Sequence, residues 1–444
     1  MVDRRVGRSQ ARLSAVSLAP TVIDVAVLRL ERWLEGMRSP AGYGGPVVHF
    51  WRDNVLFCAP AIGWRYEGIV VGYLTLHRAA GDAGWLAKAK RAGEDILAGR
   101  LPGGTFRNSG FELNPVTGGT PHEAAVDCAL LMLARCLRDV GDSSWRTYFE
   151  AADENVERLL IGRLWRAADH RFGDGGNWFV PNKAATIIEA LCLHAELSGS
   201  DEHLVRYARP TADAILDLQV RDSGGPLDGG IVQAHDGKRP VEQYFPYYVA
   251  RAVPGLLMLA SATGEERYRD AAVAAGRFLA RRRDADGAYP QLAYRGRRAN
   301  RYPRWVAGSA DIVRAVELLR QAGADADPGP TLDWLVAGQL AGGNFRIADG
   351  FAAQINQRVP AGPPDARDFM PVVGWNDKAF RVLAARYTGA EVPPAATEPA
   401  AAEHEVVWRG RRARLTENGD GVEIVSDGRV VYRWRKGADW ASIA

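Results

Sequence analysis

An apolar segment with helical periodicity recurs six times along the chain, and this repeat constrains the fold more than any other feature. The segments begin near Glu67, His122, Asn182, Tyr244, Trp305 and Asn376, so that successive starts lie 55 to 71 residues apart. They end in glycine-containing tails such as GD, SGS or TGE, which is typical of helices that terminate at a glycine. The repeat predicts one assembly of similar units rather than the three domains that 444 residues would otherwise indicate.

A second, more charged helix follows each of the first five segments. These predicted helices have apolar residues on one face and charges on the other, and they cover residues 85–99, 145–164, 203–219, 267–283 and 331–340. The opening helix, Val22 to Met37, supplies the sixth partner. Because a pair of helices cannot cover both faces of its more apolar member, six hairpins bury these members only by closing into a ring. We therefore predict an all-α fold, an (α/α)6 barrel with the apolar helices inside.

Three glycine-rich segments follow outer helices of this ring. They read QVRDSGGPLDGG, RRRDADGAYPQ and QLAGGNFRIADG, and they are similar to D-G-x-aromatic turns of known toroids. With these turns and with hairpins over about residues 20 to 390, the chain resembles the six-hairpin glycosidase superfamily, and more distantly the terpenoid-cyclase toroids. The resemblance implies the fold class but not the reaction, because similar toroids host several chemistries.

The composition of the chain divides it into four regions. Residues 1–19 form an N-terminal tail, residues 20–390 the toroid, and residues 391–405 a linker rich in Pro, Ala and Glu. In residues 406–444, apolar and polar residues alternate around N-G-D-G and S-D-G-R turns, which predicts a small C-terminal β appendage of three short strands. We expect this appendage to cover a rim of the barrel.

Charge and cysteine content argue against several classes of function. Lys and Arg number 56 against 53 Asp and Glu, a net charge of +3 that gives no reason to expect nucleic acid or a membrane as partner. The apolar runs are too short to cross a bilayer, and no secretory signal is evident, so we expect a cytoplasmic protein. The four cysteines form no C-x-x-C pair, so we expect reduced thiols, no metal and no cofactor. The oligomeric state stays open.

The starts of the six inner helices should meet at one mouth, because every inner helix of such a ring runs in the same direction. Aromatic side chains stand there beside charged or amide groups: Trp64, Tyr66, Glu67, His122, Glu123, Trp178, Asn182, Lys183, Tyr244, Tyr248, Trp305, Trp375 and Asp377. A single acid or amide at such a position is usually a helix cap. The caps of the outer helices are only charged or small and lack Trp and Tyr, however, so we predict a functional mouth.

An opening lined by aromatic residues and carboxylates suits a small-molecule or oligosaccharide substrate, since aromatic rings stack on sugar faces and carboxylates bind hydroxyls. Hydrolysis of a glycosidic bond needs one protonated and one ionised carboxyl group. Glu123 is the predicted general acid, with Glu67 or Asp377 as its partner. Asp127, one helical turn after Glu123, would raise the pKa of Glu123 by like-charge repulsion. Asp311 is a further candidate on the opposite wall, although a salt bridge to Arg65, Lys183 or Lys378 explains Asp311 and Asp377 equally well.

Two polar connections are expected to reach the same mouth. The first, RNSGFELNPVTGGTPHE, carries Asn108 and Glu112 as predicted substrate contacts, and the second carries His235. Both segments are equally compatible with ordinary surface loops.

Other reactions on the same ring remain open. A uronate lyase needs a cation or amide and a proton acceptor, which could come from His122, Asn182, Lys183, Tyr244 and Arg304. Similar sugar epimerases use a pair of histidines, but His122 is the only histidine at an inner start, with His235 on a loop. Terpenoid cyclases of the D-x-D-D type are disfavoured, because the runs at Asp284 and Asp325 lack the fourth acid. A toroid that binds a glycan or lipid without catalysis would use the same aromatic mouth.

Overall fold

Six apolar helices form a closed ring in the computed structural model, which describes residues 20–48, 55–58, 63–107, 119–175, 178–418 and 421–436. The inner helices are α2 (Arg65–Ala80), α4 (Ala124–Asp139), α6 (Pro181–Ser198), α8 (Pro246–Thr263), α10 (Ser309–Gln321) and α12 (Val373–Ala384). Each inner helix contacts the next, and α12 contacts α2 to complete the circle. The predicted (α/α)6 barrel is therefore confirmed.

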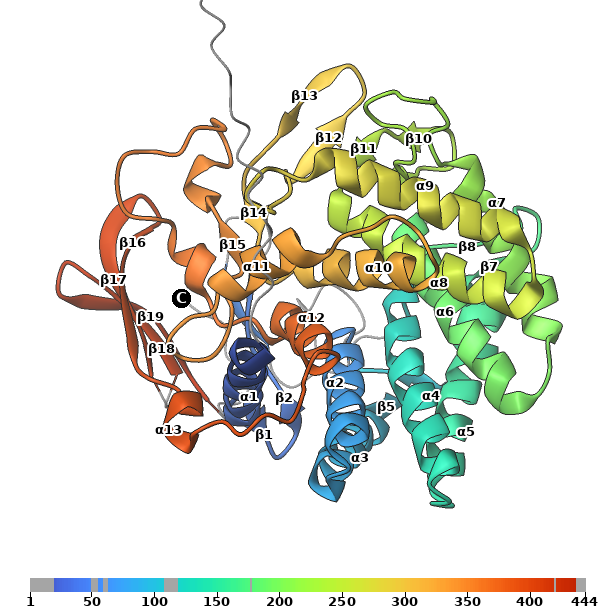
Figure 1. Cartoon of the computed structure of the whole chain (residues 1–444), viewed down its shortest axis with the longest axis horizontal. Helices are drawn as coiled ribbons and strands as arrows, with labels where there is room; N and C mark the ends of the chain where they lie inside the picture. Colours follow the sequence, from blue (N-terminus) through green and yellow to red (C-terminus); the bar gives the residue numbers. More distant parts are fainter. Residues whose placement is uncertain are drawn as a thin grey trace, which may run out of the picture.

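A second set of helices surrounds this ring. It comprises α1 (Pro20–Gly36), α3 (Ala83–Ala98), α5 (Trp145–Asn155) with its π-helical continuation η2 (Val156–Leu164), η3 (Leu204–Ala208) with α7 (Arg209–Asp217), α9 (Glu266–Arg282) and α11 (Gly329–Ala337). The helices α3, α5, α7, α9 and α11 each pack on the inner helix that precedes them, and α1 packs on α12. Figure 1 shows the pairs α2–α3 and α4–α5 side by side in its lower half. None of the described helices is both long enough and apolar enough to cross a bilayer.

Short strands and turns build the connections that lead from each outer helix to the next inner helix. The paired strands are β1 (Arg38–Ser39) with β2 (Gly42–Tyr43), β3 (Gly45–Val48) with β4 (Val55–Cys58), β5 (Arg100–Leu101) with β6 (Thr105–Phe106), β7 (Trp165–Arg166) with β8 (Arg171–Phe172), β9 (Ala234–His235) with β10 (Pro240–Val241), β14 (Arg304–Trp305) with β15 (Ala348–Asp349), and the three-stranded β11 (Gln243–Tyr244), β12 (Leu292–Tyr294) and β13 (Arg297–Asn300). Single turns are η1 (Pro121–Glu123), η4 (Phe351–Ala353) and η5 (Ala366–Phe369). Because these connections precede the inner helices, they surround the end of the ring at which those helices start.

Two glycines on α2 allow it to approach α12 closely. A Cβ atom at Gly68 would lie 2.3 Å from the backbone oxygen of Asp377, and one at Gly72 would lie 2.4 Å from the ring of Phe380. The backbone N–H of Gly68 also donates to the Asp377 carboxylate at 3.1 Å. Both distances are too short for a Cβ atom. The ring can close between α2 and α12 because residues 68 and 72 have no side chain.

A Gly68→Ala substitution is therefore expected to lower the free energy of unfolding by about 1–3 kcal/mol, because α2 must move away from α12. Urea denaturation followed by circular dichroism measures the change. The control is Gly84→Ala on α3, where the added methyl would meet only the Asp82 side chain, at 3.1 Å. Equal stability of the Gly68→Ala variant and the wild type would contradict the close packing of α2 on α12.

A four-stranded antiparallel sheet follows the ring. After the short helix α13 (Pro394–Thr397), the strands β16 (Ala402–Trp408), β17 (Arg411–Asn418), β18 (Gly421–Ser426) and β19 (Arg429–Arg435) pair in chain order. The sequence predicted three strands; a fourth is present because an additional turn at Arg409 and Gly410, both with positive φ, separates β16 from β17. The sheet lies at one edge of the molecule, at the left of Figure 1. It meets the toroid where the His404 ring stacks on Phe369, 4.2 Å away, and where Trp33 Nε1 of α1 donates to Glu417 at 3.0 Å.

Glu417 makes the contact between sheet and toroid sensitive to pH. Its side chain is buried, and burial raises its pKa from 4.5 to about 7. The folded protein thus holds this proton more tightly than the unfolded chain, so stability falls as the pH rises from about 4.5 towards about 7. A Glu417→Gln variant should be more stable than the wild type at pH 8, by roughly 1–3 kcal/mol, and lose that advantage at pH 5. Urea midpoints at the two pH values test this, and a variant less stable than the wild type at pH 8 would refute it.

Candidate active site

One cavity of about 320 Å³ opens where the six inner helices start. Every inner helix or the turn before it contributes to the wall: Trp64 before α2, His122 in η1, Asn182 and Lys183 on α6, Tyr247, Tyr248 and Arg251 on α8, Trp305 and Asp311 before and on α10, and Trp375 and Lys378 on α12. Residues far apart in the sequence therefore meet because all six helices point their N-terminal ends the same way.

An aromatic wall covers one part of the cavity. The rings of Trp305 and Trp375 stack 5.2 Å apart at an angle of 25°, and Trp64 meets Trp375 edge-on at 5.0 Å. Tyr247 extends this wall, with its ring 5.8 Å from Trp375 and 4.3 Å from Tyr248. The residue before α2 and the elements α12, β14 and α8 thus present one continuous aromatic surface.

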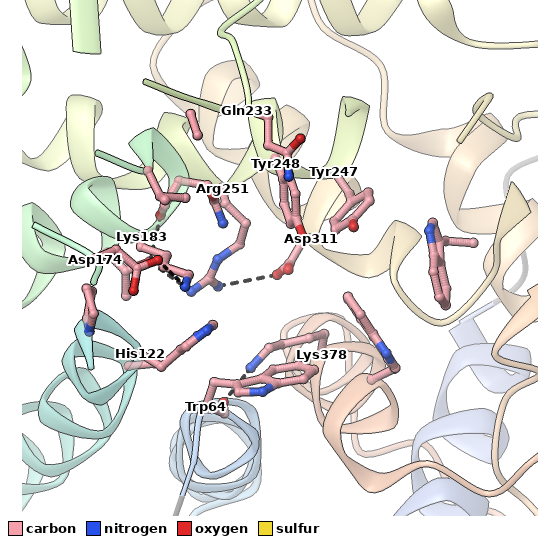
Figure 2. Close-up of a pocket in the computed structure, with 18 of the residues that line it drawn as sticks. Trp64, His122, Asp174, Lys183, Gln233, Tyr247, Tyr248, Arg251, Asp311 and Lys378 are labelled. Carbon is pink, nitrogen blue, oxygen red and sulfur yellow. Dashed lines mark hydrogen bonds and ion pairs between the residues drawn. The ribbon is translucent and has the colours of Figure 1, made fainter. Parts of the chain in front are cut away.

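A polar wall lies on the side of η1 and α6. Lys183 pairs with Asp174 at 2.5 Å, and Figure 2 shows both near His122 and across the cavity from Tyr247. The Asn182 side-chain oxygen has no hydrogen-bond partner among the described residues. Burial, followed by the charges of Lys183 and Arg251, holds the pKa of His122 well below its usual value. His122 is therefore a neutral imidazole at pH 7, able to accept a proton.

A buried group of charges forms the floor of the cavity, and Glu67 stands at its centre. Arg251 contacts Glu67 through two nitrogens, at 3.1 and 3.3 Å, and Lys378 contacts it at 3.3 Å. Arg381 is also bound to Glu67, and Arg314 lies 3.6 Å away. Burial alone would raise the pKa of Glu67, but these four cations outweigh it and hold the pKa well below the usual value.

Three further carboxyl groups complete this ion cluster. Asp311 accepts hydrogen bonds from Arg381 at 2.9 Å and from Arg251 at 3.5 Å, both at Oδ1, which leaves its Oδ2 for a ligand. Glu189 pairs with Arg314, and Asp377 pairs with Lys378 at 2.7 Å. Burial raises the pKa of Asp377 to about 7, although Lys378 opposes this shift. Of these three groups, only Asp311 lines the cavity.

The predicted site residues fall into three groups. Those that line the cavity are Trp64, His122, Trp178, Asn182, Lys183, Tyr248, Trp305, Asp311 and Trp375. Those that do not are Tyr66, Glu67, Glu123, Asp127, Tyr244 and Asp377. Asn108 and Glu112 lie outside the described residues.

Glu123 holds a loop instead of facing the cavity. Its carboxylate accepts the N–H groups of Phe106, at 2.8 Å, and of Gly119, together with Asn155 Nδ2 at 2.7 Å. The predicted role as general acid is corrected, because these donors fix the carboxylate against the connection before α4. The sequence predicted that Asp127 would raise the pKa of Glu123. In the structure it is the pKa of Asp127 that is raised well above its usual value, by burial and then by the charge of Glu123.

The predictions for Tyr66 and Tyr244 are corrected as well, because both side chains are buried against residues of the outer helices α3 and α9. The Tyr66 hydroxyl accepts the N–H of Tyr43 at 3.2 Å and lies 3.3 Å from the Asp95 carboxylate. Tyr244 packs beside Phe278, with ring centres 6.5 Å apart. Neither side chain lines the cavity, so the helix-start position alone did not decide which way a side chain points.

The sequence interpretation missed Arg251 and Asp174, and it named Lys378 only as a salt-bridge partner of Asp311 and Asp377. Arg251 lies four residues after Tyr247, inside an otherwise apolar helix, and therefore one turn deeper on the same face. Arg314 and Arg381 occupy comparable positions in the next two inner helices. Lone arginines and lone acids in apolar inner helices need one another, so their joint occurrence was the signal for a buried ion cluster. Among the described residues, no group of three His, Cys, Asp or Glu side chains is arranged to hold a metal.

Comparison with known proteins was made by sequence and by structure. No family model matches the sequence, and no curated protein is significantly similar to it. Solved structures do match. An unsaturated glucuronyl hydrolase specific for heparin superposes with a TM-score of 0.58 at 15% identity, over 83% of this chain and 96% of the other. Cellobiose 2-epimerase from Bacillus thermoamylovorans gives a TM-score of 0.61 at 10% identity, over 82% and 99%.

The third example is an α-1,6-mannanase from Salegentibacter sp., with a TM-score of 0.55 at 15% identity, over 82% of this chain and 98% of the other. The chain has the six-hairpin glycosidase-like toroid fold. This confirms the resemblance inferred from the six hairpins. At such low identity the likeness shows the fold of the toroid, and its chemistry has to be argued from the cavity.

The loop-holding role of Glu123 predicts a specific phenotype in the toroid. A Glu123→Gln variant should lose about 1–3 kcal/mol of stability, because one acceptor oxygen becomes a donor facing N–H groups. The affinity of the cavity for a ligand, followed by tryptophan fluorescence, should stay within about threefold of the wild type, since Glu123 does not line the cavity. Loss of ligand binding in a folded variant would instead show that Glu123 takes part in the binding site.

Proposed function

We propose that this toroid is a carbohydrate-active enzyme that takes its sugar into the cavity at the inner-helix starts. The observation that carries the proposal is the pairing of an aromatic wall with a polar one. The Trp64–Trp375–Trp305 surface suits the C–H face of a pyranose, and the groups around His122, Asn182 and Lys183 suit its hydroxyls. The cavity volume is that of a small-ligand site.

The structural neighbours support this choice of substrate class. Among proteins with this fold are an unsaturated glucuronyl hydrolase, an α-1,6-mannanase, a cellobiose 2-epimerase and a D-mannose isomerase. Each of these is named for a sugar or sugar polymer. Their reactions differ, so the reaction of this chain is argued from its own cavity.

Proton transfer on a sugar is the reaction that the lining groups support best. His122 is neutral, the form that a proton acceptor needs, and burial raises the pKa of Tyr248 to about 12, so its hydroxyl stays protonated and can donate a hydrogen bond to a sugar oxygen. Figure 2 shows these two residues on different sides of the cavity. Arg251 also lines the cavity and can stabilise a negative oxygen that develops during the reaction. Isomerisation, epimerisation and elimination all use this set of groups.

Glycoside hydrolysis is the second candidate, since two carboxylates line the cavity. Asp174 and Asp311 come from different elements, and Figure 2 shows them on either side of Lys183 and Arg251. They replace Glu67 and Glu123 as the pair to test. Both are held in ion pairs, however, so neither is arranged as the protonated acid that hydrolysis requires.

The proposal predicts a loss of turnover in a His122→Asn variant. We expect the rate to fall by about 10²–10⁴, because the proton acceptor is removed. Binding, read from the fluorescence of the lining tryptophans, should change little. The measurement screens mono- and disaccharides by chromatography of the products, which distinguishes a rearranged sugar, an unsaturated product and a hydrolysed bond.

Two controls separate the candidates. A Trp305→Ala variant should weaken binding of every sugar, because it removes part of the aromatic wall. If Asp174→Asn and Asp311→Asn abolish turnover, the products are hydrolytic and His122→Asn retains activity, hydrolysis replaces proton transfer. Failure of every tested sugar to bind the wild-type cavity would overturn the carbohydrate proposal itself.

A further inference from the structure

Every cation that lines the cavity in the described part of the chain already has a carboxylate partner. Arg251 is held by Glu67 through two contacts, at 3.1 and 3.3 Å. Lys183 is paired with Asp174 at 2.5 Å, and Lys378 with Asp377 at 2.7 Å. Each positive charge that faces the ligand space thus already lies beside a carboxyl group before any ligand enters.

Most of this balancing charge lies beneath the cavity and not in its wall. The ion cluster contains four cations and four carboxyl groups: Arg251, Arg314, Lys378 and Arg381 with Glu67, Glu189, Asp311 and Asp377. Glu67 is within 4.0 Å of all four cations, yet it is only 1% exposed and does not line the cavity. Of the four cations that it contacts, Arg251 and Lys378 line the cavity.

This arrangement has a consequence for the charge of the ligand. A sugar acid brings its own carboxylate into a low-dielectric space, where it is stable only beside a cation that lacks another partner. Arg251 can bind such a carboxylate only by giving up part of its contact with Glu67. The charge of Glu67 also repels the carboxylate of the ligand. A neutral sugar needs no counter-charge, and its hydroxyls can use the remaining oxygen of Asp311 and the amide of Asn182.

We infer that the cavity selects neutral sugars over sugar acids, and that Glu67 sets this preference by neutralising Arg251 and Lys378 from beneath. The inference rests on the proposed function and specifies its substrate class. Glu67 does not touch the sugar; it is a positioning residue for Arg251. Replacing Glu67 by Gln keeps the shape of the side chain and uncovers positive charge at the cavity floor.

Paired titrations test the inference with the tryptophans of the aromatic wall as reporters. The probes are glucose against glucuronate, galactose against galacturonate, and mannose against mannuronate. The wild-type protein should bind the neutral member of a pair at least tenfold more tightly. In the Glu67→Gln variant this ratio should shift by at least tenfold towards the acid.

Glu189→Gln is the matched control, because it makes the same chemical change in the same ion cluster. Glu189 pairs with Arg314, and neither residue lines the cavity, so the ratio should stay at its wild-type value. An equal shift of the affinity ratio in both variants would show that the loss of any negative charge from the cluster changes the preference. This result would overturn the specific role of Glu67.

A double variant guards against a failure of Glu67→Gln to fold. Glu67→Gln with Arg251→Gln removes one charge of each sign, so it should fold and should again prefer the neutral sugar. If the double variant favours the acid, the inference is overturned. Tighter binding of the acids by the wild-type protein would also overturn it while leaving the carbohydrate proposal standing. If no member of any pair binds, the carbohydrate proposal is the one that fails.

Discussion

The ion cluster around Glu67 is the interaction on which the rest of the structure depends. Its members come from α2, α6, α8, α10 and α12, so it links five of the six inner helices at the axis of the ring. Burying so many charges costs free energy, and a packed apolar centre of the same volume would often be at least as stable. From the position of the cluster directly under the cavity we therefore propose that it holds Arg251 and Asp311 in fixed positions beneath the ligand space.

The ring itself followed from the sequence, because its cause is local. Apolar periodicity, glycine-terminated helices and a regular spacing are properties of short segments, and six such units leave few ways to bury their apolar faces. The same reasoning placed Trp64, His122, Asn182, Trp305 and Trp375 around one opening. These residues lie at helix starts, and the direction of the helices alone brings them together.

The roles of the acidic residues did not follow, because each depends on partners far away in the chain. Glu67 meets Arg381 more than three hundred residues later, and that contact converts a predicted catalytic carboxylate into a buried counter-ion. Glu123 is likewise decided by the N–H groups of Phe106 and Gly119, which belong to a connection without periodicity. A helix-start position gives the location of a side chain, but its direction depends on such contacts.

The most direct test of this account is a crystal structure of the wild-type protein with a bound neutral sugar. The account predicts that one face of the sugar ring lies on Trp305 and Trp375, with hydroxyls directed at His122, Asn182 and Asp311, and that Glu67 stays bound to Arg251 beneath it. A sugar bound elsewhere, for example on the C-terminal sheet, or one in direct contact with Glu67 or Glu123, would contradict the account.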